Sequence, residues 1–243
     1  MQLKNYYYWW NGIFTKEECE KIIQLGLSKV PKTAVTAGRQ DVDDDSLSIP
    51  QNTKTKSELL KEGLLEKTYI RDSKVSWLYD KWIYDKLWAV FKASNKEAGW
   101  NFDIDWSEDI QFTVYENSGF YGFHSDGGSD IHGAYKRYIE GVTPGNKENK
   151  NYVSGRNKKN WIGKIRKLSV TVNLSDPNDY EGGNLLMDFG EHVEVGNGRE
   201  EITKIRPQGS CAVFPSFINH CVTPVTRGTR YSLVLWALGR PFK

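Results

Sequence analysis

The sequence lacks any long apolar run. No stretch of its 243 residues approaches the roughly 18 consecutive apolar residues of a membrane-spanning helix. Residues 1–14 are aromatic and polar, without the basic beginning and apolar centre of a secretory signal peptide. These absences exclude an integral helical membrane protein, and we expect a soluble, cytoplasmic chain without a membrane partner.

The sequence also contains few cysteines and has a small net charge. The three cysteines, Cys19, Cys211 and Cys221, lack CxxC spacing, which excludes a disulfide framework and a cysteine-rich zinc site and favours a reducing compartment. A formal net charge of +2 argues against a general nucleic-acid binder. Only residues 133–167 are strongly basic, with ten Lys and Arg against two Glu, and such a run is typical of a solvated loop.

The length and the 38% hydrophobic composition suit one substantial core, so we expect a single domain over residues 1–243. Residues 1–105 are expected to be largely helical and to support the strand-rich part of the domain. A capping box of Thr15 and Glu18 predicts the start of a first helix. Its predicted buried face contains Cys19, Ile22, Ile23, Gly26 and Leu27. A second helical pattern covers about residues 73–93, with a predicted buried stripe of Ile83, Leu87, Val90 and Phe91.

From about residue 109 onward the apolar period becomes two, which indicates strands. The predicted strands are 111–115, 167–174, 183–188, 192–195, 201–205, 212–214, 220–225 and 230–238. So many short strands without intervening helices favour a mainly β fold, an antiparallel sandwich or jelly roll over 106–243. Residues 127–164, rich in Gly, Asn and Lys, interrupt this rhythm and are predicted to be an insertion, either a functional lid or disordered.

Metal-competent side chains occur at two places in the strand-rich part. His124 and Asp126 are two residues apart, and on a strand such residues project from the same face about 7 Å apart, so they can share one ion. Alone, this pattern recurs by chance. A further histidine, His220, begins a late strand. Two histidines and a carboxylate on one face of an octahedral ion leave positions open for a chelating keto acid and dioxygen, as non-haem Fe(II) requires.

Arg230 supplies a matching group for the far end of such a keto acid. Its guanidinium has a permanent charge and a planar fork that can grip a carboxylate through two hydrogen bonds. Ser232, two residues along, points to the same side of the strand and can donate a further hydrogen bond. The sequence therefore predicts that His124, Asp126 and His220 bind Fe(II) and that Arg230 binds the far carboxylate of a keto acid.

The order of these motifs resembles the prolyl 4-hydroxylase-like branch of the Fe(II)/2-oxoglutarate oxygenases, especially the bacterial and phage PKHD-type hydroxylases. The resemblance covers about half of the chain and is carried by HxD at 124–126, LSVTVNLSDPNDYEGG at 168–183 and FPS…HCVTPVTRGTRYSLVLW at 214–236. It implies a double-stranded β-helix, that is, a cupin-like jelly roll, with the N-terminal helices packed on one sheet. It also implies that the keto acid is 2-oxoglutarate, that Arg230 binds its distal carboxylate and that Tyr115 hydrogen-bonds it.

The activity implied by this resemblance is hydroxylation of a prolyl residue in a peptide or protein, coupled to decarboxylation of 2-oxoglutarate to succinate and CO2, with ascorbate as a further cofactor. Collagen-type relatives have lysine where this chain has Arg230, which weakens the inference of a collagen-like substrate. Asp126 argues against a halogenase, because that chemistry replaces the carboxylate ligand. Two alternatives stay open: a hydroxylase of a free amino acid or another small molecule, and a non-catalytic jelly-roll binding module.

Several other residues are weighed beside this site. His132 could compete as a ligand, but it and His192 lack the spacing of the triad. Asn173 faces either the pocket or a polar outer surface. Gly182 and Gly183 are expected to form a turn near the pocket mouth. We hypothesise that aromatic residues of the insertion close over the substrate: Tyr135, Tyr138, Tyr152 and Trp161.

Overall fold

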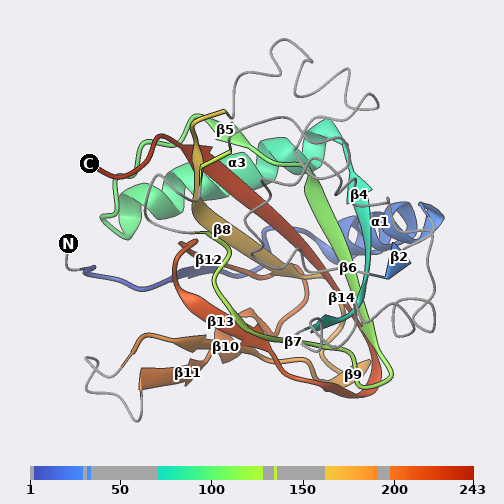
Figure 1. Cartoon of the computed structure of the whole chain (residues 1–243). Helices are drawn as coiled ribbons and strands as arrows, with labels where there is room; N and C mark the ends of the chain where they lie inside the picture. Colours follow the sequence, from blue (N-terminus) through green and yellow to red (C-terminus); the bar gives the residue numbers. More distant parts are fainter. Residues whose placement is uncertain (1–2, 30–31, 34–70, 128–133, 136–161, 191–197) are drawn as a thin grey trace, which may run out of the picture.

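The computed structural model describes residues 3–29, 32–33, 71–127, 134–135, 162–190 and 198–243. Within these residues two antiparallel sheets face each other, and two helices cover the outer side of the larger sheet (Figure 1). This arrangement confirms the predicted jelly roll with helices packed on one sheet. Neither described helix is long and apolar enough to cross a membrane.

The elements of the two sheets come from all parts of the described chain. The larger sheet contains β1 (Tyr8–Trp10), β2 (Lys32–Thr33), β4 (Lys74–Leu78), β5 (Trp106–Ser107), β6 (Ile110–Glu116), β8 (Ile165–Asn173), β9 (Tyr180–Gly182), β12 (Cys211–Pro215) and β14 (Val225–Gly239). The smaller sheet contains β3 (Arg71–Asp72), β7 (Phe120–His124), β10 (Leu185–Asp188), β11 (Arg199–Glu201) and β13 (Asn219–Val222). The helices are α1 (Lys16–Ser28) and α3 (Lys81–Glu97), with a 3-10 turn at Thr203–Ile205.

The strand order places β14 at the centre of the larger sheet. That order is β1-β12-β8-β14-β6-β4-β2, with β5 and β9 also paired to β14. The smaller sheet has the order β11-β10-β13-β7-β3. Residues 1–105, predicted as largely helical, therefore also contribute strands to both sheets, since β1 and β4 extend the larger sheet and β3 is an edge of the smaller one.

The larger sheet has one apolar and one polar face, because successive side chains of a strand point to opposite sides. The apolar face packs against Ile22 of α1 and Ile83, Leu87 and Phe91 of α3. It is formed by Phe112, Val114, Val170, Val172, Leu233 and Leu235. The opposite face is turned toward the smaller sheet and is largely polar, with Thr113, Ser169, Thr171, Asn173 and Ser232. The main core thus lies between helices and sheet, and polar groups occupy the space between the two sheets.

Helix α1 begins where the capping box predicts. The Thr15 hydroxyl accepts a hydrogen bond from the Glu18 backbone N–H at 3.3 Å, and the Glu18 carboxylate accepts one from the Thr15 backbone N–H at 2.9 Å. Cys19, Ile22 and Gly26 are buried as predicted. Ile23 is only partly buried, and Leu27 is 42% exposed. The prediction was wrong there because α1 contacts the sheet through a narrow stripe centred on Gly26.

Gly26 permits a very close approach of α1 to the larger sheet. A methyl group at this position would lie 2.3 Å from the ring of the fully buried Phe112. We expect Gly26→Ala to lower the free energy of unfolding by up to about 2 kcal/mol, because overpacking costs about 1–3 kcal/mol and the better helix propensity of alanine offsets about 1 kcal/mol. Denaturant unfolding measures this change. Leu27→Ala is the neighbouring exposed control, and an equal loss in both variants would contradict the close packing.

The second predicted helix starts later than its pattern indicates. Residues 74–78, part of the predicted helix 73–93, form β4, which pairs with β6, and α3 begins at Lys81 after the extended residue Asp80. The prediction was wrong over β4 because strand pairing with a segment distant in sequence overrides local periodicity. Of the predicted stripe, Ile83, Leu87 and Phe91 are fully buried, as expected, whereas Val90 is only partly buried.

Two later strands also differ from the prediction. The predicted strand 201–205 ends at Glu201, and the 3-10 turn that follows buries Ile205 in a cluster with Leu185 and Met187. The predicted strand 220–225 divides into β13 and the start of β14, since Pro224 stands between Val222 and Val225 and has no N–H for a ladder. Strand 192–195 and most of the insertion 127–164 lie outside the described residues.

Candidate functional site

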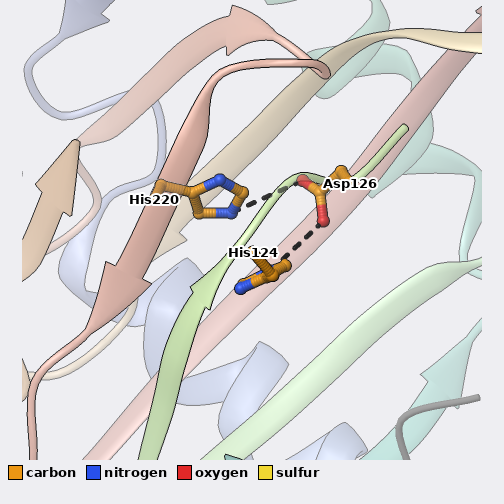
Figure 2. Close-up of side chains that lie close together, drawn as sticks. All are labelled: His124, Asp126 and His220. Carbon is orange, nitrogen blue, oxygen red and sulfur yellow. Dashed lines mark ion pairs between the residues drawn. The ribbon is translucent and has the colours of Figure 1, made fainter. Parts of the chain in front are cut away.

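Three side chains that could hold a metal ion meet at one end of β7 and β13 (Figure 2). His124 is the last residue of β7, and His220 lies directly opposite it on β13. The Asp126 carboxylate lies 3.5 Å from His124 Nε2 and 3.6 Å from His220 Nε2. One ligand atom from each residue lies within 4.8 Å of the others. The spacing of His124 and Asp126 predicts both on a strand, but Asp126 lies beyond the strand end, where neighbouring loops must hold it.

Both imidazole rings are held by their other nitrogen. Nδ1 of His124 lies 2.8 Å from the Gly122 carbonyl oxygen, and Nδ1 of His220 lies 3.0 Å from the Ile218 carbonyl oxygen. A carbonyl oxygen can only accept, so each Nδ1 must carry the proton that it donates. Each Nε2 then keeps a free lone pair directed toward Asp126, and this is the tautomer that metal-binding histidines use.

The charges of the three groups also suit a divalent cation. Burial alone would raise the pKa of Asp126, but the neighbouring imidazoles of His220 and His124 outweigh it and hold that pKa well below its ordinary range. Burial lowers the pKa of His220, although the Asp126 carboxylate partly opposes this shift. At neutral pH Asp126 is therefore a carboxylate and His220 a neutral imidazole. Two neutral imidazole nitrogens and one carboxylate form a donor set that fits Fe(II).

Arg230 places a cation in the polar space between the sheets. It lies on β14, is 2% exposed, and its Nη1 is buried without a hydrogen-bond partner among the described residues. A buried donor that lacks a partner is destabilising, and an anionic ligand would satisfy it. Gly183 leaves room here, since a Cβ at that residue would lie 2.8 Å from Arg230 Cδ. This arrangement fits a carboxylate-bearing ligand between the sheets.

The other two predicted co-substrate residues lie beside Arg230. Tyr115 is directly opposite Arg230 on β6, and the Arg230 guanidinium lies 5.5 Å from the centre of its ring. Ser232 lies between Thr113 and Asn173 on neighbouring strands and is 1% exposed. Asn173 is also buried, so it does not belong to an outer surface; its amide donates to the Ser175 and Arg206 carbonyls at 3.0 and 2.7 Å.

Two residues near the triad do not stand out in the sequence. The Tyr121 ring stacks on the His124 ring with a centroid distance of 3.5 Å, and the Arg71 guanidinium lies 4.5 Å from the Tyr121 ring centre. Residues three apart on a regular strand point to opposite faces. Tyr121 and His124 meet because the β7–β13 pairing is irregular at this point, and sequence periodicity does not predict such a shift.

Most of the remaining candidates cannot be placed. His132, His192, Tyr138, Tyr152 and Trp161 lie outside the described residues. Tyr135 is described, and its hydroxyl donates to the buried Glu108 carboxylate at 2.5 Å. Gly182 and Gly183 have positive φ angles of 71° and 61°, as expected of turn formers.

Known proteins are similar in sequence to the strand-rich part of this chain. Residues 110–238 match the 2OG-Fe(II) oxygenase superfamily. The PKHD-type hydroxylase YbiX of Escherichia coli O1:K1 / APEC is 34% identical over 127 residues, which cover 51% of this chain and 40% of that relative. The protein of the same name from Escherichia fergusonii matches to the same extent. The match therefore spans less than half the length of these relatives.

Solved structures share the fold across nearly the whole chain. A viral collagen prolyl hydroxylase from Paramecium Bursaria Chlorella virus-1, in complex with 2OG, aligns over 97% of both chains with a TM-score of 0.53 and 16% identity. A prolyl hydroxylase from Trichoplax adhaerens, in complex with a peptide fragment of the hypoxia inducible factor oxygen degradation domain, aligns over 96% of this chain and 84% of its own, with a TM-score of 0.58 and 15% identity. At these identities the likeness establishes the jelly-roll fold alone.

Proposed function

The chain belongs to the 2OG-Fe(II) oxygenase superfamily, and from this premise we propose that it hydroxylates a prolyl residue in a peptide or protein, with His124, Asp126 and His220 as the iron ligands. The matched region is a 2-oxoglutarate-dependent dioxygenase domain, whose cofactors are Fe(II) and 2-oxoglutarate. One observation carries the assignment of the site: a His/Asp/His cluster and a buried arginine that lacks a partner for Nη1 among the described residues occur in the same fold.

Each residue of the site then has a defined task. His124, Asp126 and His220 would hold the metal through two imidazole nitrogens and a carboxylate, a donor set that suits Fe(II). Arg230 binds the distal carboxylate of 2-oxoglutarate through its guanidinium fork, and Tyr115 and Ser232 supply further hydrogen bonds to this co-substrate. When bound, Fe(II) supplies the dioxygen chemistry that couples decarboxylation of 2-oxoglutarate to succinate and CO2 with hydroxylation of a C–H bond. Tyr115 packs with Val222 and Val225 in a small apolar cluster.

A prolyl residue is the substrate that the similarities favour. Both solved structures named above are prolyl hydroxylases, one of them with a bound peptide fragment. The alternatives within the same chemistry are a free amino acid and another small molecule. A non-catalytic jelly-roll module would have no use for a buried guanidinium between its sheets, so Arg230 argues against it.

Substrate class can be tested directly. The purified protein is incubated with Fe(II), 2-oxoglutarate and ascorbate together with proline-containing peptides, the same peptides with alanine in place of proline, or free proline. We expect the gain of one oxygen atom, detected by mass spectrometry, in the proline-containing peptides alone, with a matching amount of succinate. Oxygen gain in free proline but in no peptide would overturn the peptide assignment while leaving the oxygenase chemistry in place.

A further inference from the structure

An ion pair between the partly exposed Arg166 and the buried Glu108 lies next to the candidate iron ligand Asp126. Arg166, near the start of β8, donates from Nε and Nη2 to the two oxygens of the Glu108 carboxylate at 2.5 and 2.7 Å. Glu108 is 2% exposed and follows β5 directly. The guanidinium also lies 3.9 Å from the centre of the Trp236 ring. A two-point fork on one side and an aromatic face on another leave Arg166 little freedom to move.

The third guanidinium nitrogen of Arg166 is directed to the loop that carries Asp126. Its Nη1 donates to the backbone carbonyl of Asp126 at 3.1 Å. The next residue, Gly127, donates its N–H to the Ser216 carbonyl at 2.9 Å, and a Cβ there would lie 2.9 Å from Arg166 Cβ. Because β7 ends at His124, no strand ladder holds Asp126. Its position depends instead on the hydrogen bonds to Arg166 and Ser216.

Tyr135 joins the same cluster from the 127–164 segment. Its hydroxyl donates to the Glu108 oxygen that also accepts from Arg166 Nε. The Tyr135 backbone is tied in turn to the far end of the segment, because its N–H donates to the Lys164 carbonyl at 3.0 Å and its carbonyl accepts from the Gly163 N–H at 2.8 Å. Glu108 therefore accepts both from the residue that contacts the metal-ligand loop and from the described part of the segment.

The ion pair also determines which Asp126 oxygen Arg166 contacts. Glu108 occupies the edge of the guanidinium that carries Nε and Nη2, so Nη1 is the nitrogen directed to Asp126, and it contacts the backbone oxygen. A guanidinium released from Glu108 would be free to pair with the nearby Asp126 carboxylate. It would then compete with a metal ion for the same two oxygens.

We propose that Arg166, held in place by Glu108 and Tyr135, is a positioning residue that keeps the Asp126 carboxylate available to the metal, and that Tyr135 thereby couples the described part of the 127–164 segment to the metal centre. This inference rests on the proposed iron site. It assigns no contact with substrate to Arg166, Glu108 or Tyr135. Partners of this kind next to a metal ligand typically change metal affinity about 10- to 100-fold.

The test measures metal binding in the absence of turnover. Co(II) alone is titrated into the metal-free protein, and the visible absorption of bound Co(II) reports both affinity and ligand geometry. We expect Arg166→Lys and Glu108→Gln each to weaken Co(II) binding by about 10- to 100-fold and to change the absorption spectrum. Tyr135→Phe, which removes one hydroxyl, should weaken binding by less than about tenfold. The double variant Arg166→Lys/Glu108→Gln should bind about as weakly as the weaker single variant, because the two residues act as a unit.

Two controls separate this role from a general effect on folding. Arg227→Lys alters an exposed arginine paired with Glu181 and should leave the Co(II) titration unchanged. Thermal unfolding of each metal-free variant reports its stability. If Arg166→Lys and Glu108→Gln prevent folding, Tyr135→Phe alone decides the test. Unchanged Co(II) affinity and spectrum in the folded variants would overturn the positioning role. Absence of Co(II) binding in the wild type would instead overturn the proposed iron site.

Discussion

Replacing His220 with alanine is expected to reduce Fe(II)-dependent formation of succinate from 2-oxoglutarate by at least about 100-fold, since loss of a ligand should exceed the roughly 10- to 100-fold effect of a neighbouring partner. His220 is 6% exposed, lies opposite His124, and directs a free Nε2 lone pair toward Asp126. The variant leaves one imidazole and one carboxylate, an incomplete donor set for Fe(II). Succinate measured against Fe(II) concentration checks this expectation.

A second histidine provides the matched control. The sequence contains four histidines, of which His132 is the competing ligand candidate from the insertion. We expect His132→Ala to form succinate at the wild-type rate. Wild-type turnover in His220→Ala would remove the proposed iron site, and a loss in His132→Ala as large as in His220→Ala would make His132 a ligand. Unfolding of both metal-free variants excludes simple loss of the fold.

The strand-rich half was predictable because its patterns are local. In β6 the alternation places Phe112 and Val114 against the helices and Thr113 and Tyr115 toward the other sheet, as a period of two requires. The N-terminal third was less predictable. The residues of β4 fit a helical period as well as a strand, and only pairing with β6 decides between them.

The candidate site also has a part that the sequence predicts and a part that it does not. The proposed ligand and co-substrate residues stand out by residue type and order, so the sequence alone is enough to single out His220 and Arg230 as candidates. The cluster around Asp126 does not stand out, because Glu108 and Arg166 are 58 residues apart and form an ordinary acidic and basic pair in the sequence. Such a pair is recognised only when folding joins the end of β5 to the start of β8 beside the metal-ligand loop.

Arg230→Ala should raise the 2-oxoglutarate concentration needed for half-maximal succinate formation by about 30-fold or more. The variant removes a buried guanidinium from the polar space between the sheets, and loss of one partner of a buried charged pair costs about 2–5 kcal/mol, where each 1.4 kcal/mol is about tenfold. Arg230 is not one of the three clustered ligand residues, so Co(II) affinity should change little. Arg230→Ala should therefore change the 2-oxoglutarate requirement without changing metal affinity, whereas His220→Ala removes a proposed metal ligand.

Two further variants of β14 sharpen this prediction. Arg230→Lys keeps the charge but not the planar fork, so the 2-oxoglutarate requirement should lie between those of the wild type and Arg230→Ala. Arg227→Ala removes an exposed arginine of the same strand and should leave the requirement unchanged. If Arg230→Ala lowered the maximal rate without raising the requirement, Arg230 would not bind the co-substrate, and the distal carboxylate would have to be held by another group. Equal losses of Co(II) affinity and 2-oxoglutarate affinity would instead indicate that Arg230 maintains the whole space between the sheets, because a residue that binds only the far carboxylate has no reason to affect the metal ligands.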